Sequence, residues 1–107
     1  MIYIEIDSIR YPASVAGRLR DASWDGRKTK SVTLEMDYAQ ALSLFCEGLQ
    51  WNIVCVNEDG TEEVFDNSEY SMAGPITDHR DGTVTVKMGA VTAEEALQAL
   101  LAKYGAL

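Results

Sequence analysis

The residue types that most often carry out acid–base or nucleophilic chemistry are sparse in this chain of 107 residues. The one histidine, His79, begins the triplet His79-Arg80-Asp81, which matches the start of the catalytic-loop motif of protein kinases. The sequence has no asparagine at the spacing that this motif requires, no glycine-rich phosphate loop and no Asp-Phe-Gly triplet. Because aspartate commonly stabilises turns by bonding its own backbone, a structural turn explains the triplet better than proton transfer does.

Six carboxylates in the second half of the chain offer the oxygen ligands that a hard cation such as Ca²⁺ prefers. They are Glu58, Asp59, Glu62, Glu63, Asp66 and Glu69. Their spacing fits no EF-hand loop, and on a strand of period two half of them point away from the other half. A solvated acidic strand edge that discourages sheet-to-sheet aggregation is the better explanation, so we assign no metal site and no cofactor.

The two cysteines, Cys46 and Cys55, lack the Cys-x-x-Cys spacing of redox and metal sites and lie among apolar residues. We therefore expect two buried free thiols rather than a disulfide or a nucleophile. Serine and threonine are plentiful, but a single histidine is available to activate any of them. The sequence predicts no catalytic residue, and we expect the protein not to be an enzyme.

The charge is acidic overall and unevenly distributed. The formal net charge is −8, yet residues 1–30 hold six of the nine cations and four of the seventeen acids, which leaves a net −10 for the remainder. An acidic chain of this kind does not suit a phosphate backbone, so we expect no nucleic-acid partner. The apolar runs are too short for a membrane span and the N-terminus has no signal-peptide pattern, which predicts a soluble, intracellular protein without a membrane partner.

Alternation of apolar and polar residues predicts most of the strands, beginning with residues 2–6. The clearest feature is the segment 75–88, which is typical of two strands joined by a two-residue turn at Asp81-Gly82, with a positive φ at the glycine. In contrast, residues 20–30 show no period and are predicted to form a loop. Both alternating sets of residues 51–56 are mostly apolar, which indicates a strand covered on both faces.

Two helices are predicted, at about 37–49 and 92–104. Each begins with a capping-box pattern, Asp37 with Gln40 and Thr92 with Glu95, and Gly105 is expected to end the second. The expected core-facing residues are Tyr38, Ala41, Leu42, Phe45 and Leu49 in the first helix, and Leu97, Leu100, Leu101 and Tyr104 in the second. The opposite side of the second helix carries alanines at 96, 99 and 102, which helix propensity explains better than a docking surface does.

These elements predict one α+β domain over residues 1–107, with a mostly antiparallel sheet of six to seven strands and two helices. A sheet of that size tends to curl toward a barrel. We expect the core to be lined by Leu42, Phe45, Trp51, Ile53, Val84, Val86, Leu97 and Leu101.

The segment 20–30 also carries the most distinctive surface chemistry. Trp24 lies between Arg20 and the pair Arg27-Lys28, and tryptophan and arginine are the residue types most enriched at interface hot spots. Either Trp24 folds back to cap the core, or it stays exposed as an anchor. We hypothesise a protein-interaction site at Trp24, Arg27, Lys28 and Arg20, in which the basic segment of one copy meets an acidic face of the next.

Several segments together resemble small uncharacterised prophage-encoded proteins of gut Firmicutes, from the tail and structural gene region. They are Tyr-Pro at 11–12, Trp-Asp-Gly-Arg at 24–27, Val-Thr-Leu-Glu-Met at 32–36, Asp-Asn-Ser-Glu-Tyr at 66–70, and Gly-Pro-Ile-Thr-Asp-His-Arg-Asp-Gly-Thr-Val-Thr-Val-Lys-Met-Gly at 74–89. The resemblance covers nearly the whole chain, and the run at 74–89 is its most specific part.

The resemblance implies a genomic setting and no active-site residue. We therefore expect a non-enzymatic phage structural or assembly protein, associated with the tail, whose partners are other phage structural proteins and further copies of itself. The alternative is an acidic phage-encoded inhibitor or DNA mimic that binds a host protein. In either case the protein is expected in the cytoplasm of the bacterial host or in the virion.

Overall fold

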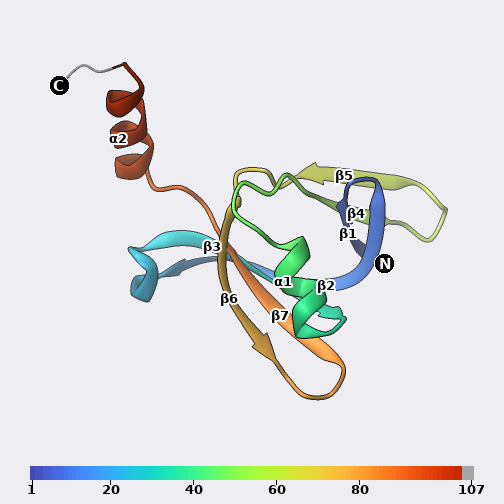
Figure 1. Cartoon of the computed structure of the whole chain (residues 1–107). Helices are drawn as coiled ribbons and strands as arrows, with labels where there is room; N and C mark the ends of the chain where they lie inside the picture. The colour runs from blue at the N-terminus through green and yellow to red at the C-terminus, as the bar shows by residue number, and fades with distance from the viewer. Residues whose placement is uncertain (105–107) are drawn as a thin grey trace.

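The computed structural model describes the backbone of residues 1–104 and, in that range, all side chains except those of Arg18, Leu19 and Tyr104. The strands are β1 (Ile2–Ile6), β2 (Ile9–Asp21), β3 (Arg27–Glu35), β4 (Asn52–Val56), β5 (Glu62–Asp66), β6 (Met72–Asp78) and β7 (Thr83–Gly89). The helices are α1 (Tyr38–Leu44) and α2 (Ala93–Tyr104), and a short 3-10 turn, η1, spans Ala22–Trp24 (Figure 1). This is the α+β fold that the sequence predicts; Gly105 and the side chain of Tyr104 lie outside what is described.

The seven strands form one antiparallel sheet in the order β5-β4-β1-β2-β3-β7-β6. The long strand β2 serves two partners in turn, because residues 9–12 pair with β1 and residues 13–21 pair with β3. Pro12 lies at this change of partner, where its missing N–H is least disruptive. Across the described residues no ladder joins β5 to β6, so the sheet is open and the predicted curling does not close a barrel.

The hairpin between β6 and β7 confirms one part of its prediction and corrects another. Gly82 has φ of +90°, as predicted. The turn is longer than two residues, however, since four residues separate the strands, and the second positive φ belongs to Arg80 (+59°) rather than to Asp81. The Asp81 carboxylate accepts the Thr83 backbone N–H at 3.0 Å, a local bond of the kind that stabilises turns.

Replacement of Gly82 by valine should lower the free energy of unfolding by more than ~1 kcal/mol, because a β-branched residue is strained at a positive φ. A Cβ at this position would meet no atom within 4 Å, so the loss reports the backbone conformation alone. The measurement is a urea unfolding curve, with Gly82→Asn as the control, since asparagine tolerates this conformation. Equal midpoints for the parent and Gly82→Val are incompatible with the left-handed turn.

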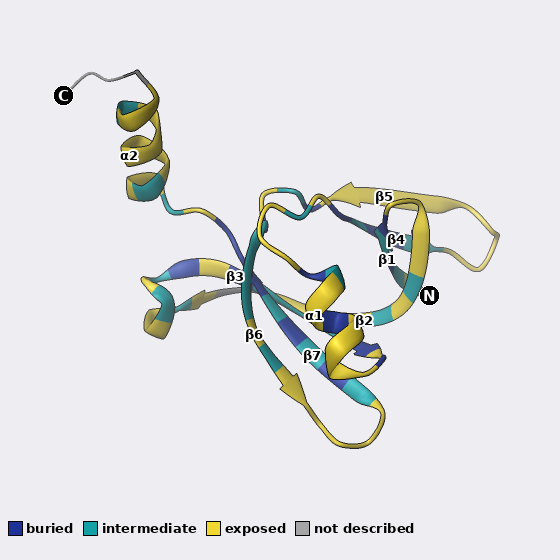
Figure 2. Cartoon of the chain, viewed as in Figure 1, coloured by how far each residue is buried: buried dark blue, intermediate teal, exposed yellow. Residues whose placement is uncertain are grey.

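The core lies between one face of the sheet and α1, as the burial colouring of Figure 2 shows for β3, β7 and α1. Its largest fully buried side chains are Trp51 and Phe45, whose rings meet edge to face with centroids 6.5 Å apart. The Trp51 Nε1–H donates to the carbonyl of Tyr70 at 2.9 Å, so the indole is buried without an unpaired donor. Five predicted core residues are confirmed: Phe45, Trp51, Ile53, Val84 and Val86.

Four predictions about residues 37–49 are wrong. The helix is shorter than 37–49, because it ends at Leu44 and Phe45 leaves the helical conformation as its C-cap. The inward face then holds Ala41 and Phe45. Tyr38 and Leu42, which are predicted to face the core, are 45% and 56% exposed. Cys46 follows the helix end and is exposed, whereas Cys55 is half-buried; both are free thiols.

The second helix is predicted to pack on the sheet, and it does not. Leu97 is 55% exposed, and Leu101 is half-buried but lies outside the core. Only residues 90–92 separate β7 from α2, and the Arg27–Glu95 pair holds the first turn of the helix at the end of the sheet. As Figures 1 and 2 show, α2 stands clear of the body with mostly exposed residues. The radius of gyration is accordingly 15.4 Å, above the ~13 Å typical of a compact chain of this length.

Candidate functional site

The segment predicted as a loop, residues 20–30, is mostly β-strand. Residues 20–21 are the last two of β2 and residues 27–30 are the first four of β3, so only residues 22–26 form the turn. The Asp21 side chain caps η1 by accepting the Ser23 N–H at 3.0 Å. This turn lies beside the start of α2, and together they form one end of the molecule. We call it the basic end and define it by Arg20, Trp24, Arg27, Lys28 and residues 90–93.

Trp24 folds back onto the sheet. A Cβ at Gly74 or at Gly89 would lie 2.8 Å from Cζ3 of the indole, so the ring rests directly on the two glycines in β6 and β7. On the basic end the guanidinium of Arg27 lies over the same ring, with its Cζ 4.9 Å from the centroid. Of the two roles considered for Trp24, the geometry matches the cap on the sheet rather than the exposed anchor.

Arg27 is buried at 2% exposure and joins α2 to the sheet. Its Nη1 and Nη2 donate to the two carboxylate oxygens of Glu95 at 2.6 and 2.8 Å, a bidentate pair of the kind that fixes both position and angle. Its remaining donors bond the carbonyls of Ala90 and Trp24, each at 3.1 Å. The guanidinium is thus occupied inside the molecule, and Arg27 acts within the chain rather than on a neighbour.

Glu95 also completes the predicted capping box. Its backbone N–H donates to Thr92 Oγ1 at 3.2 Å, and its carboxylate accepts the Thr92 N–H at 2.9 Å. Hydrogen bonding by Arg27, and next by the Thr92 N–H, lowers the pKa of Glu95 to about 2. One carboxylate therefore starts the helix and fixes it to the sheet.

Acid should weaken the attachment of α2 to the sheet through the Arg27–Glu95 pair. The folded pKa of Glu95, about 2, lies below its usual value of 4.5. Protonation therefore favours the unfolded chain, so the stabilisation is present above pH 4.5 and is lost as the pH falls toward 2. Unfolding curves across that window should show a smaller pH dependence for Glu95→Gln than for the parent, while the neighbour variant Glu94→Gln keeps the parent's slope. Equal slopes for the parent and Glu95→Gln contradict this role.

Arg20 and Lys28 remain available at the basic end. They are opposite each other in the β2–β3 register, both are exposed, and neither pairs with a carboxylate within residues 1–104. Like charges facing each other across two strands are unfavourable unless an anion lies nearby. With residues 90–93 and the single carboxylate of Glu69 they line a cavity of about 310 Å³ at the base of α2. Two of the four predicted interaction residues thus face solvent without an ion-pair partner among the described residues.

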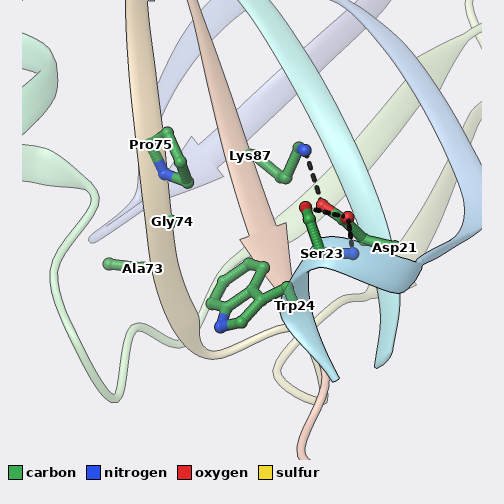
Figure 3. A pocket seen from close by; sticks show the side chains of 7 residues that line it. All are labelled: Asp21, Ser23, Trp24, Ala73, Gly74, Pro75 and Lys87. Atoms are coloured by element: carbon green, nitrogen blue, oxygen red, sulfur yellow. Dashed lines mark hydrogen bonds and ion pairs between the residues drawn. The ribbon is translucent and has the colours of Figure 1, made fainter. Parts of the chain in front are cut away.

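A second cavity, of about 400 Å³, is lined by Trp24 together with Asp21, Ser23, Lys87 and residues 73–75 (Figure 3). Asp21 forms an ion pair with Lys87 at 2.7 Å and accepts the Ser23 hydroxyl. These bonds, that of Lys87 first, lower the pKa of Asp21 to about 2. A carboxylate with so low a pKa is a weak base at neutral pH, so the group suits bracing the turn better than activating Ser23.

The other chemically suggestive residues serve local structure. His79 Nε2 lies 2.7 Å from Thr85 Oγ1, and Asp81 is engaged in the turn described above. Glu62 forms a bidentate pair with Arg10 at 2.7 and 2.8 Å. Among the described residues no three His, Cys, Asp or Glu side chains come together as a metal site.

Sequence reasoning missed Glu95, Gly74 and Gly89 as parts of this end of the molecule. The capping pattern identifies Glu95 as a helix start, but nothing local indicates its pairing with Arg27, 68 positions away. The glycines belong to predicted strands, and only the packed indole explains why no larger residue fits there.

No described helix is long and apolar enough to cross a membrane. Comparison of the chain with protein-family models, curated proteins and solved structures finds no match. The function is therefore inferred from the chain's own surfaces.

Proposed function

We propose that the protein is a non-enzymatic structural or assembly component of a phage or prophage, associated with the tail. One observation carries the proposal: the leucine stripe of α2 is uncovered in the described chain. Leu97 and Leu100 are 55% and 50% exposed on one side of the helix, with Leu101 half-buried beside them. An amphipathic helix normally buries such a stripe, so its exposure on an element that stands clear of the body favours a partner molecule.

The attachment of α2 supports the same proposal. The Arg27–Glu95 pair and the Thr92 cap fix the first turn of the helix to the sheet, so the leucine stripe is presented in a defined direction. A preorganised surface binds with a smaller loss of conformational entropy than a loose one does. The resemblance to proteins from prophage tail regions agrees with a role in protein–protein contact, with other phage structural proteins and further copies as partners.

A second candidate is an acidic inhibitor or DNA mimic that occupies a basic site on a host protein. It is favoured by the exposed carboxylates Glu58 and Glu63 around the edge strand β5, in a chain of net charge −8. The leucines of α2 distinguish the two functions, since the assembly component needs them and the inhibitor does not.

Co-sedimentation with purified particles of the phage that encodes the protein distinguishes between the two functions. The protein should pellet with particles, and the double variant Leu97→Ser, Leu100→Ser should stay in the supernatant. Leu42→Ser is the matched control, because this leucine is equally exposed but lies on α1. A parent protein that stays in the supernatant at every particle concentration contradicts the proposal, and stoichiometric capture of one host protein, lost on reversal of Glu58 and Glu63, establishes the inhibitor instead.

A further inference from the structure

We infer that the leucine stripe of α2 packs against strand β5 of a second copy of this chain, in a head-to-tail contact. The inference rests on the proposed function and names the partner of the same helix. Three comparisons support it. The helix α2 matches β5 in exposed apolar surface and in length, and the basic end matches the region of β5 in charge.

Strand β5 is an exposed edge strand of the sheet. All five of its residues are exposed, and Phe65 keeps 49% of its surface open although it lies beside the buried Ile53 in the register with β4. Glu63 and Phe65 share one face of β5, since side chains alternate along a strand. The opposite face carries Glu62, which is paired with Arg10, and Val64, which is 56% exposed. The face with Glu63 and Phe65 lies on the core side of the sheet, because Phe65 is opposite the buried Ile53, and it is uncovered among the described residues.

The helix and the strand match in length. The 12 residues of α2 span ~18 Å as a helix, and the five residues of β5 span ~17 Å as a strand. A helix laid along β5 would continue the layer that α1 already makes against the same sheet. Leu97 and Leu100 would then cover Phe65, extending the hydrophobic core across the boundary between two copies.

The charges beside α2 in one copy and beside β5 in the next are opposite in sign when the helix runs parallel to the strand. Arg20 and Lys28 line the cavity at the first turn of α2, on the N-terminal side of the leucines. Glu58 and Glu63 likewise precede Phe65, in the turn before β5 and in the strand itself. Neither carboxylate has a hydrogen-bond or ion-pair partner among the described residues. The unpaired cations of one copy thus meet the unpaired carboxylates of the next, which fixes orientation as well as attraction.

The two surfaces lie at different ends of the molecule. In Figure 1, α2 and the β2–β3 turn are at the left and the β4–β5 hairpin is at the far right. The longest dimension of the molecule is 52 Å. The helix α2 of one copy therefore cannot bind β5 of the same copy. Two copies form one such contact between them, unless the rotation that relates them closes a ring of two. Contacts of this heterologous type generate rings or stacks, which is the geometry of a tubular assembly.

The test uses two charge-reversed chains, each of which has the same sign of charge at both surfaces and so repels further copies of itself. The first carries Arg20→Glu and Lys28→Glu, and the second carries Glu58→Lys and Glu63→Lys. Sedimentation velocity should show the parent as a concentration-dependent series larger than a dimer, and each variant alone as a monomer. An equimolar mixture should assemble again like the parent, because the intact basic end meets the intact acidic end and the two reversed ends are also opposite in charge. Glu35→Lys, at the opposite end of β3 from Lys28, is the control and should assemble like the parent.

Other outcomes overturn the inference in distinguishable ways. If both variants assemble like the parent, the contact lies elsewhere, as in a symmetric pairing of two α2 helices, and the proposed function stands. If the parent is monomeric at every concentration, no self-contact exists, and co-sedimentation with particles still decides the proposed function. Thermal melts show that the variants are folded, and Lys28→Gln, with Glu58→Gln as its counterpart, replaces any reversal that unfolds; unaltered association of both milder variants counts against the charge match.

Discussion

Replacement of Phe45 by alanine should lower the free energy of unfolding by ~3–5 kcal/mol, a large part of the total stability of a domain of this size. Phe45 is 2% exposed and its ring meets the Trp51 indole edge to face. Removal of the ring loses its burial and leaves a cavity beneath α1 that the short helix cannot fill. The measurement is the urea unfolding midpoint together with its slope.

Leu42→Ala is the matched control for this substitution. Leu42 lies three residues earlier on the same segment and is 56% exposed, so its truncation should change the free energy of unfolding by no more than ~0.5 kcal/mol. A loss at Leu42 equal to that at Phe45 would show that the helix presents its other face to the sheet.

Replacement of Gly74 by alanine should lower the free energy of unfolding by ~1–3 kcal/mol through overpacking. The added Cβ would lie 2.6 Å from the carbonyl oxygen of Lys87 and 2.8 Å from the Trp24 ring. The carbonyl is part of the neighbouring strand and cannot move without disturbing the ladder between β6 and β7. Trp24 must also leave its position, and so the turn between β2 and β3 is disturbed with it.

Gly17→Ala provides the comparison. Its Cβ would lie 2.8 Å from the side chain of Lys30, with no backbone atom in its three closest contacts. A flexible side chain gives way at lower cost, so the loss should be smaller than at Gly74. If Gly74→Ala unfolds at the parent's midpoint, the indole does not rest on β6.

Local patterns in the sequence predict most of the core. Alternation identifies β1 and β7, and the doubly apolar pattern of β4 matches the burial of both Ile53 and Val54, which point to opposite faces. Both helix starts follow from capping signals, because a cap involves only residues three apart. These features depend on neighbours in the chain, which a sequence displays directly.

The errors arise where the fold depends on distant residues. The start of β3 does not look like a strand because Arg27 and Thr29 point inward, and a buried arginine is tolerable only through Glu95, which is remote in sequence. The stripe of α2 predicts correctly that the helix has an apolar face, but amphipathicity does not specify what covers it. The four predicted interaction residues do gather at one end, yet two of them turn inward.

The most direct test of α2 as an intermolecular element is sedimentation velocity of the parent and of Leu97→Asp, Leu100→Asp, each accompanied by a thermal melt. If α2 binds another copy, the parent sediments as an assembly and the variant as a monomer. Because the leucines lie outside the core of their own chain, the melting temperature of the variant at monomeric concentration stays that of the parent. An unchanged mass distribution contradicts this, because it shows that the leucines do not hold the assembly together. A monomeric parent whose melting temperature falls on substitution also contradicts it and shows that the leucines serve their own chain.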